Sequence, residues 1–520
     1  MSTEFSNTAK NASVIGLTAL LGAVFGFGLQ LLVAYYFGAD NSTDAFFMAQ
    51  STSELLGKLL LGGSVASLFV PLFISAKKKQ GDEVANNLAL NIFHITSVLF
   101  IVLIGIIAIF TPQFVTFIAP GFDQQTHDLT VRILRILLPS FLFLFWVDLG
   151  TAILHSLGRF GVPAKSRLIA PTVSIIAVSA LATSIGIYAL ALGTLIGSTV
   201  QVAWIAWSLR HEGLRYRFIF SPSHPDITRL VSLLYPFIFS MLVTQGAGIT
   251  YRVLVSDLSA GSLTALKFAE KITQLCTIIF ITSITSVVYP RLARHFSEGD
   301  SKKLLSSLKQ ALRLIVFITA PLVIGVALLR VPLITTIFEH GSFTTEDTLY
   351  TSSALLFFSI GLITNGISTL FGYATLALQK TKISVAITIT SQVAAILLFL
   401  ALVPLMGHNG LALTSSLVPL VSGALYITYI KRHVPNLSTV FVDAVYLKIA
   451  FLSALLGLAV YYSLHVITKL NLGSITTILE LIVPTVVGIA TYTLGAYMWK
   501  IPEMTEAFQI IQSKIIKLKK

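Results

Sequence analysis

Long apolar runs separated by short polar breaks fill most of this 520-residue chain. A helix needs about 20 apolar residues to cross the hydrocarbon core of a bilayer, so each run of that length predicts one membrane-spanning helix. The predicted spans lie at roughly 14–37, 47–74, 87–110, 131–156, 164–186, 188–209, 233–257, 265–289, 309–330, 350–376, 382–404, 409–430, 446–467 and 476–499. We therefore expect an all-α polytopic membrane protein with 14 transmembrane helices.

The composition excludes an ordinary water-soluble protein. Hydrophobic residues make up 55% of the chain and charged residues 11%, with a mean hydropathy of +0.86, whereas soluble domains carry roughly 25% charged residues. The single cysteine, Cys276, excludes a disulfide scaffold and a multi-cysteine metal site. A net charge of +13 would suggest nucleic-acid binding in a soluble protein. Here the basic residues cluster between apolar runs, so we attribute the charge to membrane topology.

Basic residues concentrate in every second break between the predicted spans. These breaks contain Lys10, Lys77, Lys78, Lys79, Arg159, Lys165, Arg167, Arg210, Arg215, Arg217, Arg229, Arg291, Arg294, Lys302, Lys303, Lys380, Lys382, Lys431, Arg432 and the lysines of the C-terminal tail. The intervening breaks are acidic or nearly uncharged, as at Asp40, Asp123 and Asp257. Because basic loops stay in the cytoplasm, both termini are predicted to be cytoplasmic.

An internal duplication is visible at an offset of about 220 residues. The aligned pairs are Ser42–Ala45 with Ser262–Ala265, Pro71 with Pro290, Gly81-Asp82 with Gly299-Asp300, Pro112 with Pro332, Gly121 with Gly341, and Leu190–Leu192 with Leu411–Leu413. Each repeat holds six spans, an even number, so both repeats insert in the same orientation. We expect them to be related by a pseudo-two-fold axis along the membrane normal, with a binding site at their interface.

The repeat divides the chain into four predicted parts. They are an N-terminal six-helix lobe at 1–220, a C-terminal six-helix lobe at 221–440, an extra helix pair at 441–500 and an amphipathic basic tail at 501–520. In the tail an apolar stripe lies beside lysines, which is typical of an interfacial helix on an anionic leaflet. Two similar bundles with a cleft between them are typical of a transporter.

Charged residues inside the predicted spans are the candidate site, because ionised groups at that depth are costly unless they face water or a partner. Lys58 is roughly eleven residues from the outer end, about half-way across at ~1.5 Å per residue, too deep to snorkel. The candidate substrate-binding residues are Lys58, Lys271, Lys267 and Arg252, with Glu54, Glu270 and Asp148 as supporting groups. The excess of cations favours an anionic substrate such as a phosphate or pyrophosphate.

Each of these residues also has a structural interpretation. Arg252 and Lys267 lie near predicted span boundaries and could snorkel to the interface. Glu54 and Lys58 are four residues apart and could pair with each other, while Lys267 and Lys271 share one helical face beside Glu270. Asp148 could join neighbouring helices through a hydrogen bond.

No enzyme motif is present. The chain lacks a G-x-x-x-x-G-K-[ST] phosphate loop, an H-E-x-x-H zinc motif and a G-x-S-x-G nucleophile elbow, and it has no loop long enough for a catalytic domain. We therefore expect a transporter without cofactor or metal, driven by the membrane potential or an ion gradient.

Several segments resemble a known family. Phe37–Phe47, FGADNSTDAFF, resembles the F-G-A-x-x-x-T-D-A-F-F signature of the MurJ (MviN) lipid II flippases, within the multidrug/oligosaccharidyl-lipid/polysaccharide exporter superfamily. Ala119–Phe122, Arg159–Ala164 and Ile337–Phe343 resemble three further family motifs, A-P-G-F, R-F-x-x-P-A and L-F-x-x-G-x-F. The resemblance spans nearly the whole chain and implies the family's 14-helix fold.

The resemblance implies a function and site residues. MurJ proteins move the undecaprenyl-pyrophosphate-linked peptidoglycan precursor across the bacterial cytoplasmic membrane by alternating access, with a cationic cavity for the pyrophosphate and a groove at helices 13 and 14 for the lipid tail. Asp44 falls in the first motif, Lys271 at a family arginine and Gln274 at a family glutamate, so Asp44 and Gln274 join the supporting residues. Ala23 and Leu29 stand where the family has arginines in helix 1.

The sequence is also compatible with other functions. They are export of another lipid-linked oligosaccharide or polysaccharide, cation-coupled export of a small molecule with Asp148 as the cation site, a membrane glycosyltransferase, and a non-transporting scaffold. A glycosyltransferase needs a carboxylate or histidine pair in a sizeable outer loop, and the outer loops here are short. The expected partners are a lipid-linked anionic glycan, membrane lipids and a coupling ion, with no nucleic acid, and the protein is expected to be a monomer.

Overall fold

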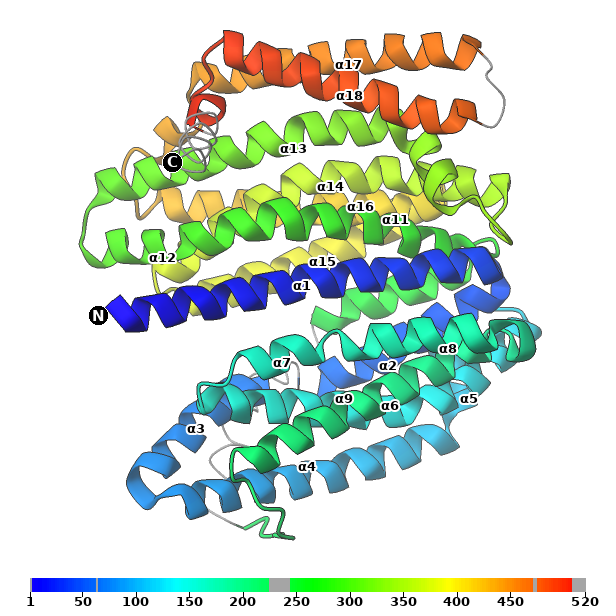
Figure 1. The fold of residues 1–520 in the computed structure, drawn as a ribbon, viewed down its shortest axis with the longest axis vertical. Helices are drawn as coiled ribbons and strands as arrows, with labels where there is room; N and C mark the ends of the chain where they lie inside the picture. The colour runs from blue at the N-terminus through cyan, green and yellow to red at the C-terminus, as the bar shows by residue number, and fades with distance from the viewer. Residues whose placement is uncertain (1, 62–63, 224–243, 471–474, 507–520) are drawn as a thin grey trace, which may run out of the picture. The chain divides into compact units, whose positions relative to one another are not determined.

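The computed structural model describes residues 2–61, 64–223, 244–470 and 475–506, with the side chains of 2–15 and 56–68 outside that description. Every regular element in these ranges is a helix (Figure 1), which confirms the predicted all-α class. The chain divides into two compact units, Met1–Thr264 and Ala265–Lys520.

The first unit is built around one central helix. Its elements are α1 (Ser2–Phe37), α2 (Asn41–Leu61), α3 (Ser64–Gln80), α4 (Asp82–Ile109), α5 (Thr111–Ile118), α6 (Gln124–Ser156), α7 (Gly161–Ser166), α8 (Ile169–Ile185), α9 (Tyr188–His211) and a further helical stretch at 244–256. Helix α6 packs against α2, α3, α4, α5 and α9, whereas α8 lies along α9 and α1. Its central position explains why so many of its side chains are buried, including Leu134, Phe141 and Leu154.

The second unit has a core helix and an appended pair. Its elements are α11 (Ser262–Cys276, begun in the first unit), η1 (Thr277–Thr282), α12 (Ser283–Ser297), α13 (Ser301–Phe338), α14 (Thr345–Ala377), α15 (Thr381–Met406), α16 (His408–Lys431), η2 (Leu437–Val440), α17 (Ala444–Leu470) and α18 (Thr476–Met498). Helix α14 packs on α13 and α16, and α17 and α18 lie side by side against α13 (Figure 1). Gly488 and Gly495 let α18 approach Leu456 and Leu452 of α17 closely.

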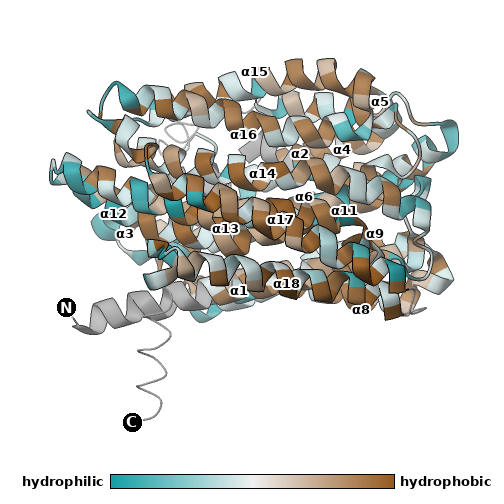
Figure 2. Cartoon of the chain, turned by 90° about the horizontal axis from the view of Figure 1, so that it is seen from above, coloured by the Kyte–Doolittle hydropathy of each residue, from teal (hydrophilic) through white to brown (hydrophobic). Residues whose placement is uncertain are grey.

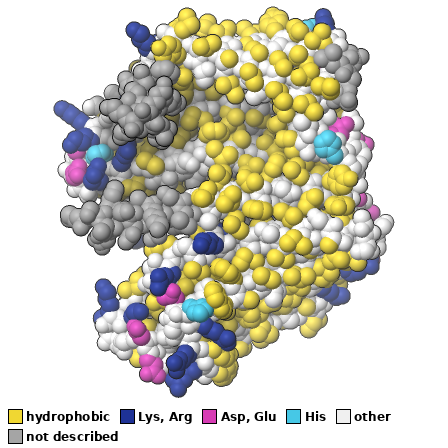
Figure 3. All heavy atoms as spheres, viewed as in Figure 1, with side chains coloured by type: hydrophobic (Ala, Val, Ile, Leu, Met, Phe, Trp, Pro, Cys, Tyr) yellow, Lys and Arg dark blue, Asp and Glu magenta, His cyan; other side chains and the backbone are white. Residues whose placement is uncertain are grey.

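Twelve helices within the described ranges are long and apolar enough to cross a membrane. The predicted span 47–74 corresponds to α2 and α3, with residues 62–63 outside the description, and 233–257 lies partly in the undescribed segment 224–243. The two spans at 47–74 and 233–257, and with them the total of fourteen, therefore remain predictions. Hydrophilic residues gather at the helix ends (Figure 2), and hydrophobic side chains are spread widely over the face in Figure 3.

One predicted span differs from a regular helix. The run 265–289 corresponds to α11 and α12 joined through η1, a π-helical turn at Thr277–Thr282. A π-helical turn inserts an extra residue into the helical repeat, so it changes the face that each later residue presents; such turns are frequent at functional sites. The apolar pattern gave no sign of it.

The family-like motifs have structural roles within each unit. Gly38 has a φ of 66°, which suits glycine, and ends α1 before Asp40 caps α2 by accepting from the backbone N–H groups of Ser42 (2.9 Å) and Thr43 (3.0 Å). At Gly121 a Cβ atom would lie 2.6 Å from the backbone of Asp257, so only glycine fits there.

The motif at Ile337–Phe343 closes the end of α13. Phe338 stacks on Phe268 of α11 with ring centroids 5.1 Å apart, and Phe343 packs against both rings. Glu339 accepts hydrogen bonds from the hydroxyls of Thr345 and Thr348, both at 2.7 Å, which fixes the turn to the first helical turns of α14. This motif therefore joins three helices of the second unit.

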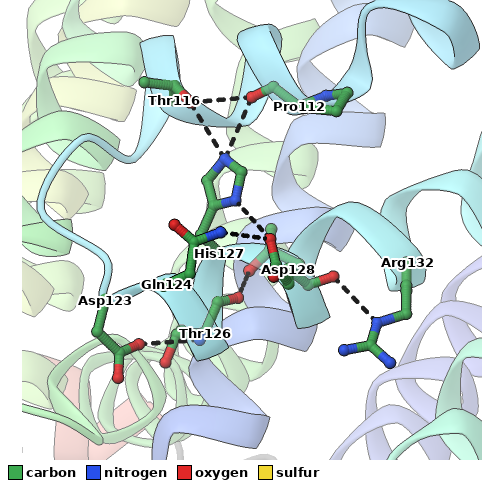
Figure 4. Close-up of polar contacts among 9 residues, drawn as sticks. Pro112, Thr116, Asp123, Gln124, Thr126, His127, Asp128 and Arg132 are labelled. Carbon is green, nitrogen blue, oxygen red and sulfur yellow. Dashed lines mark hydrogen bonds and ion pairs between the residues drawn. The ribbon is translucent and has the colours of Figure 1, made fainter.

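A polar network joins α5 to α6 at their common end (Figure 4). The His127 Nε2 atom lies 3.1 Å from the Thr116 hydroxyl and 3.2 Å from the Pro112 carbonyl, and His127 Nδ1 lies 3.2 Å from the Asp128 carboxylate. Gln124 Nε2 donates to the same carboxylate at 2.9 Å. These contacts hold the short helix α5 against the start of α6.

Candidate substrate-binding site

Helix α11 carries a polar stripe on an otherwise apolar element. Lys267, Glu270, Lys271 and Gln274 follow the i, i+3, i+4, i+7 spacing of one helical face. The opposite face is fully buried in the protein, through Leu266, Phe268 and Ala269, each at 0% exposure. Four polar residues therefore project away from the side of α11 that is packed.

Two of these residues form an ion pair. Lys267 Nζ lies 2.9 Å from Glu270 Oε2, with 28% and 50% of the two side chains exposed. Lys271 is half-buried and Gln274 is exposed. With two lysines and one glutamate, the stripe as a whole has a formal net charge of +1. The expectation that Lys267 and Lys271 share one helical face beside Glu270 is confirmed.

In the first unit, Arg252 is held against α2. Its Nη2 donates to the Ser51 carbonyl (2.6 Å) and its Nε to the Ser51 hydroxyl (3.2 Å), while Nη1 donates to the Gly248 carbonyl (2.7 Å). The carboxylate of Glu54, one turn further along α2, attracts the same guanidinium electrostatically. Arg252 thus joins α2 to the 244–256 helix and does not snorkel freely.

Asp44 is the most tightly bound of the supporting residues. It is 4% exposed, and its carboxylate accepts from the Gly261 N–H (2.8 Å), the Thr264 N–H (2.8 Å) and the Thr264 hydroxyl (2.6 Å). These N–H groups belong to the start of α11, where helices leave donors unsatisfied. Asp44, from the first turn of α2, therefore caps a second helix within the first unit.

The two remaining candidates are Asp148 and Lys58. Asp148, in α6, is attracted electrostatically by Arg167, which follows α7. Lys58 lies in the helical register of Ser51 and Glu54 on α2, but its side chain falls outside the described residues, so its expected pairing with Glu54 stays a prediction. The contacts of Arg252 with Ser51 and Glu54 lie in the first unit, and the polar stripe of α11 lies in the second unit.

A charged network that the sequence did not predict lies where α17 begins and α18 ends. Arg313 of α13 contacts Glu503 (2.7 Å) and Asp443 (3.5 Å), and Lys309 contacts Asp443 (3.0 Å). The side chains of Arg313, Asp443 and Glu503 are at most 17% exposed. The i, i+4 spacing of Lys309 and Arg313 was the available signal, but their partners lie over a hundred residues away. The network fastens both ends of the α17–α18 pair to α13.

Relatives of the chain share one description. A family model described as lipid II flippase MurJ matches residues 33–483. The probable lipid II flippase MurJ of Rickettsia prowazekii is 24% identical over 505 residues, covering 95% of this chain and 98% of the relative. The lipid II flippase MurJ of Burkholderia cenocepacia is 26% identical over 411 residues, covering 77% and 79%.

Solved structures show the same fold. A lipid II flippase MurJ in an inward closed conformation superposes with a TM-score of 0.79 at 24% identity, covering 93% of this chain and 98% of that one. An inward-facing multidrug resistance MATE family transporter of the MOP superfamily gives a TM-score of 0.67 at 14% identity, covering 80% and 95%. Because the family model covers most of the sequence, this chain belongs to the MurJ family of lipid II flippases.

Proposed function

We propose that this protein is a flippase that moves lipid II, a polyprenyl-pyrophosphate-linked peptidoglycan precursor, across the bacterial cytoplasmic membrane by alternating access. The observation that carries the proposal is the polar stripe of α11, whose two lysines and one glutamate give it a net positive charge, in a helix whose other face is buried. Membership in a family of transporters makes this a transport function and not an enzymatic one.

The cationic residues have distinct roles in this proposal. Lys271 and Lys58 contact the pyrophosphate, because an ammonium group donates strong charge-assisted hydrogen bonds to phosphate oxygens. Lys267 contributes when its pair with Glu270 opens, and Gln274 donates a neutral hydrogen bond. Arg252 is already tied to Ser51, so it positions α2 and Glu54 beside the cavity.

The division of the chain into parts is also a proposal. It comprises repeats at 1–220 and 221–440, a helix pair at 441–500 whose outer surface receives the lipid tail, and a basic tail at 501–520. Exposed apolar side chains on the pair, such as Leu447 at 76% and Phe451 at 57%, support the tail-binding role. We further propose cytoplasmic termini, from the distribution of basic loops, and a monomeric transporter with a coupling ion.

A specific observation favours a second candidate, export of another lipid-linked oligosaccharide or polysaccharide. Ala23 and Leu29 occupy the positions where the family resemblance places arginines, so α1 supplies no cation there. A headgroup with less negative charge would need fewer cations. Cation-coupled export of a small molecule is less well supported, because the charge of Arg167 attracts Asp148 and competes with a bound cation.

Complementation distinguishes the two candidates. The full chain is expressed in a bacterial strain depleted of its own lipid II flippase, and separately in a strain that lacks a flippase for a different lipid-linked glycan. Growth of the first strain alone supports lipid II as the substrate. Rescue of the second strain alone, at equal membrane levels of the protein, supports the alternative.

A further inference from the structure

A largely apolar cavity lies inside the first unit, and none of the proposed substrate-binding residues lines it. Its volume is about 270 Å³, and it lies between α4, α6, α9 and the segment 212–221 that follows α9. The lining consists of Ala89, Leu90, Phe93, Trp146, Leu149, Gly150, Ile153, Val202, Ile205, Ala206, Leu209, Arg210, Leu214 and Tyr216. Arg210 is the only one of them that carries a charge.

The segment 212–221 forms one wall of the cavity and is fixed to α4. The Asn91 side chain donates to the Ser221 carbonyl (3.0 Å) and accepts from the Ser221 N–H (2.8 Å). His94 Nε2 lies 3.1 Å from the Tyr216 hydroxyl, and the His94 ring also contacts the ring of Phe218. The wall is therefore built by specific side-chain contacts of the folded unit.

The surroundings of the cavity are those of a membrane interface. Trp204 and Trp207 of α9 are 38% and 56% exposed, and Tyr216 and Phe218 are 62% and 73% exposed. Aromatic rings at the end of a spanning helix are typical of the headgroup level. Helix α9 ends the sixth predicted crossing, so this level belongs to the leaflet on the side of the N-terminus.

Arg210 is available to bind an anion. It is exposed, and it forms no ion pair with an acidic side chain of the described residues. Its neighbours differ, because Arg159 pairs with Glu212 at 2.7 Å and Arg217 pairs with Glu83 at 3.2 Å. A positive charge thus lies at the edge of an apolar pocket at headgroup depth.

We propose that this cavity binds an anionic phospholipid of the bilayer, with an acyl chain between α4, α6 and α9 and the headgroup phosphate on Arg210. The apolar lining suits a hydrocarbon chain, and a guanidinium suits a phosphate. The site uses none of Lys58, Lys271, Lys267 or Arg252, so it does not depend on the proposed substrate. Its occupant is a resident membrane lipid.

Trp146 provides a reporter inside the cavity. It is half-buried, and its Nε1 donates to the Ser97 hydroxyl (2.9 Å), which fixes the ring at the cavity wall. A variant with Trp204, Trp207 and Trp499 changed to Phe keeps Trp146 as the only tryptophan. A second variant that keeps only Trp499 reports ordinary lipid contact. Both are titrated in detergent micelles with phosphatidylglycerol or phosphatidylcholine carrying dibrominated chains, which quench tryptophan fluorescence.

Matched substitutions test the two ends of the lipid. Ala206→Phe fills the cavity, and Ala203→Phe adds the same ring on an exposed position of α9 outside the lining. Arg210→Gln removes the cation, and Arg215→Gln removes an exposed neighbouring charge that does not line the cavity. Each substitution is made in both single-tryptophan proteins. Quenching of Trp499 in the second protein shows whether the substituted protein remains folded and in contact with lipid.

The expected result is saturable quenching of Trp146, at about five-fold lower mole fraction of phosphatidylglycerol than of phosphatidylcholine. Ala206→Phe abolishes the saturable phase and Arg210→Gln removes the preference, whereas both control substitutions leave them unchanged. Equal, non-saturable quenching by both lipids, unaffected by Ala206→Phe, would overturn the proposal. So would displacement of the quencher by undecaprenyl phosphate but not by unlabelled phosphatidylglycerol, since it would assign the cavity to a prenyl chain.

Discussion

Asp44 binds Thr264, the residue that occupies its own position in the second predicted repeat, 220 residues further along. The contact joins the start of α2 to the start of α11 within the first unit. It also explains why an aspartate is needed on one side and a threonine on the other, because a carboxylate accepts two hydrogen bonds that Thr264 donates.

Asp44→Asn is expected to weaken this contact. An asparagine has one acceptor oxygen where the carboxylate has two, so at least one N–H group at Gly261 or Thr264 loses its partner, at a cost of about 1–3 kcal/mol. The backbone amides of Gly261 and Thr264 should exchange hydrogen roughly ten- to a hundred-fold faster. Asp40→Asn is the control, because asparagine caps a helix as well as aspartate does. Equal exchange in both variants would refute the role of the charge.

Glu503→Gln is expected to destabilise the second unit. Glutamine at position 503 leaves the partly buried Arg313 with the more distant carboxylate of Asp443 alone, which costs about 1–3 kcal/mol. The measurement is the free energy of unfolding of the purified protein in detergent. Lys303→Ala is the matched control, because Lys303 pairs with Asp300 at the surface, where a salt bridge contributes about 0–1 kcal/mol. A similar small loss in both variants would show that the network does not hold the helix pair.

The turn after α13 is expected to lose stability in acid. Burial alone raises the pKa of Glu339, but hydrogen bonds from Thr348 and Thr345 outweigh it and hold the pKa below its ordinary value of 4.5. A lowered pKa means that Glu339 stabilises the fold fully above pH 4.5, and that this contribution is lost as the pH falls through the lowered value. Glu339→Gln should therefore lower the melting temperature at pH 7 and reduce its dependence on pH below 4.5. An unchanged pH profile would contradict this.

Sequence reasoning was most successful where the physical cause is local. The predicted spans 131–156, 350–376 and 409–430 lie within α6, α14 and α16, and the predicted span 87–110 ends one residue beyond α4. Such spans are predictable because the thickness of the bilayer sets the length of an apolar run. The spacing of Lys267, Glu270 and Lys271 predicted one helical face, and the ion pair lies on it. Asp123 was noted only as an outer charge, yet it caps α6 through the Thr126 N–H.

Sequence reasoning missed the features that depend on a partner far away in the chain. Nothing near Arg313 in the sequence points to Glu503, which is 190 residues away, and burial of that pair depends on how α17 and α18 pack. Glu54 attracts Arg252, which lies far away in the sequence, and no local pattern points to that neighbour. The expected pairing of Glu54 with Lys58 stays a prediction, because the Lys58 side chain lies outside the described residues. The π-helical turn at Thr277–Thr282 has no signal in hydropathy, because all of its positions are compatible with an ordinary helix.

The central claim is that cations on α2 and α11 bind the anionic headgroup, and Lys271 tests it most directly. The measurement is the amount of lipid II exposed on the outer leaflet of cells that depend on this protein, at equal membrane levels of each variant. Lys271→Ala should abolish exposure, Lys271→Arg should retain most of it, and Lys382→Ala, at a predicted cytoplasmic break, should have no effect. Wild-type exposure with Lys271→Ala would contradict the account.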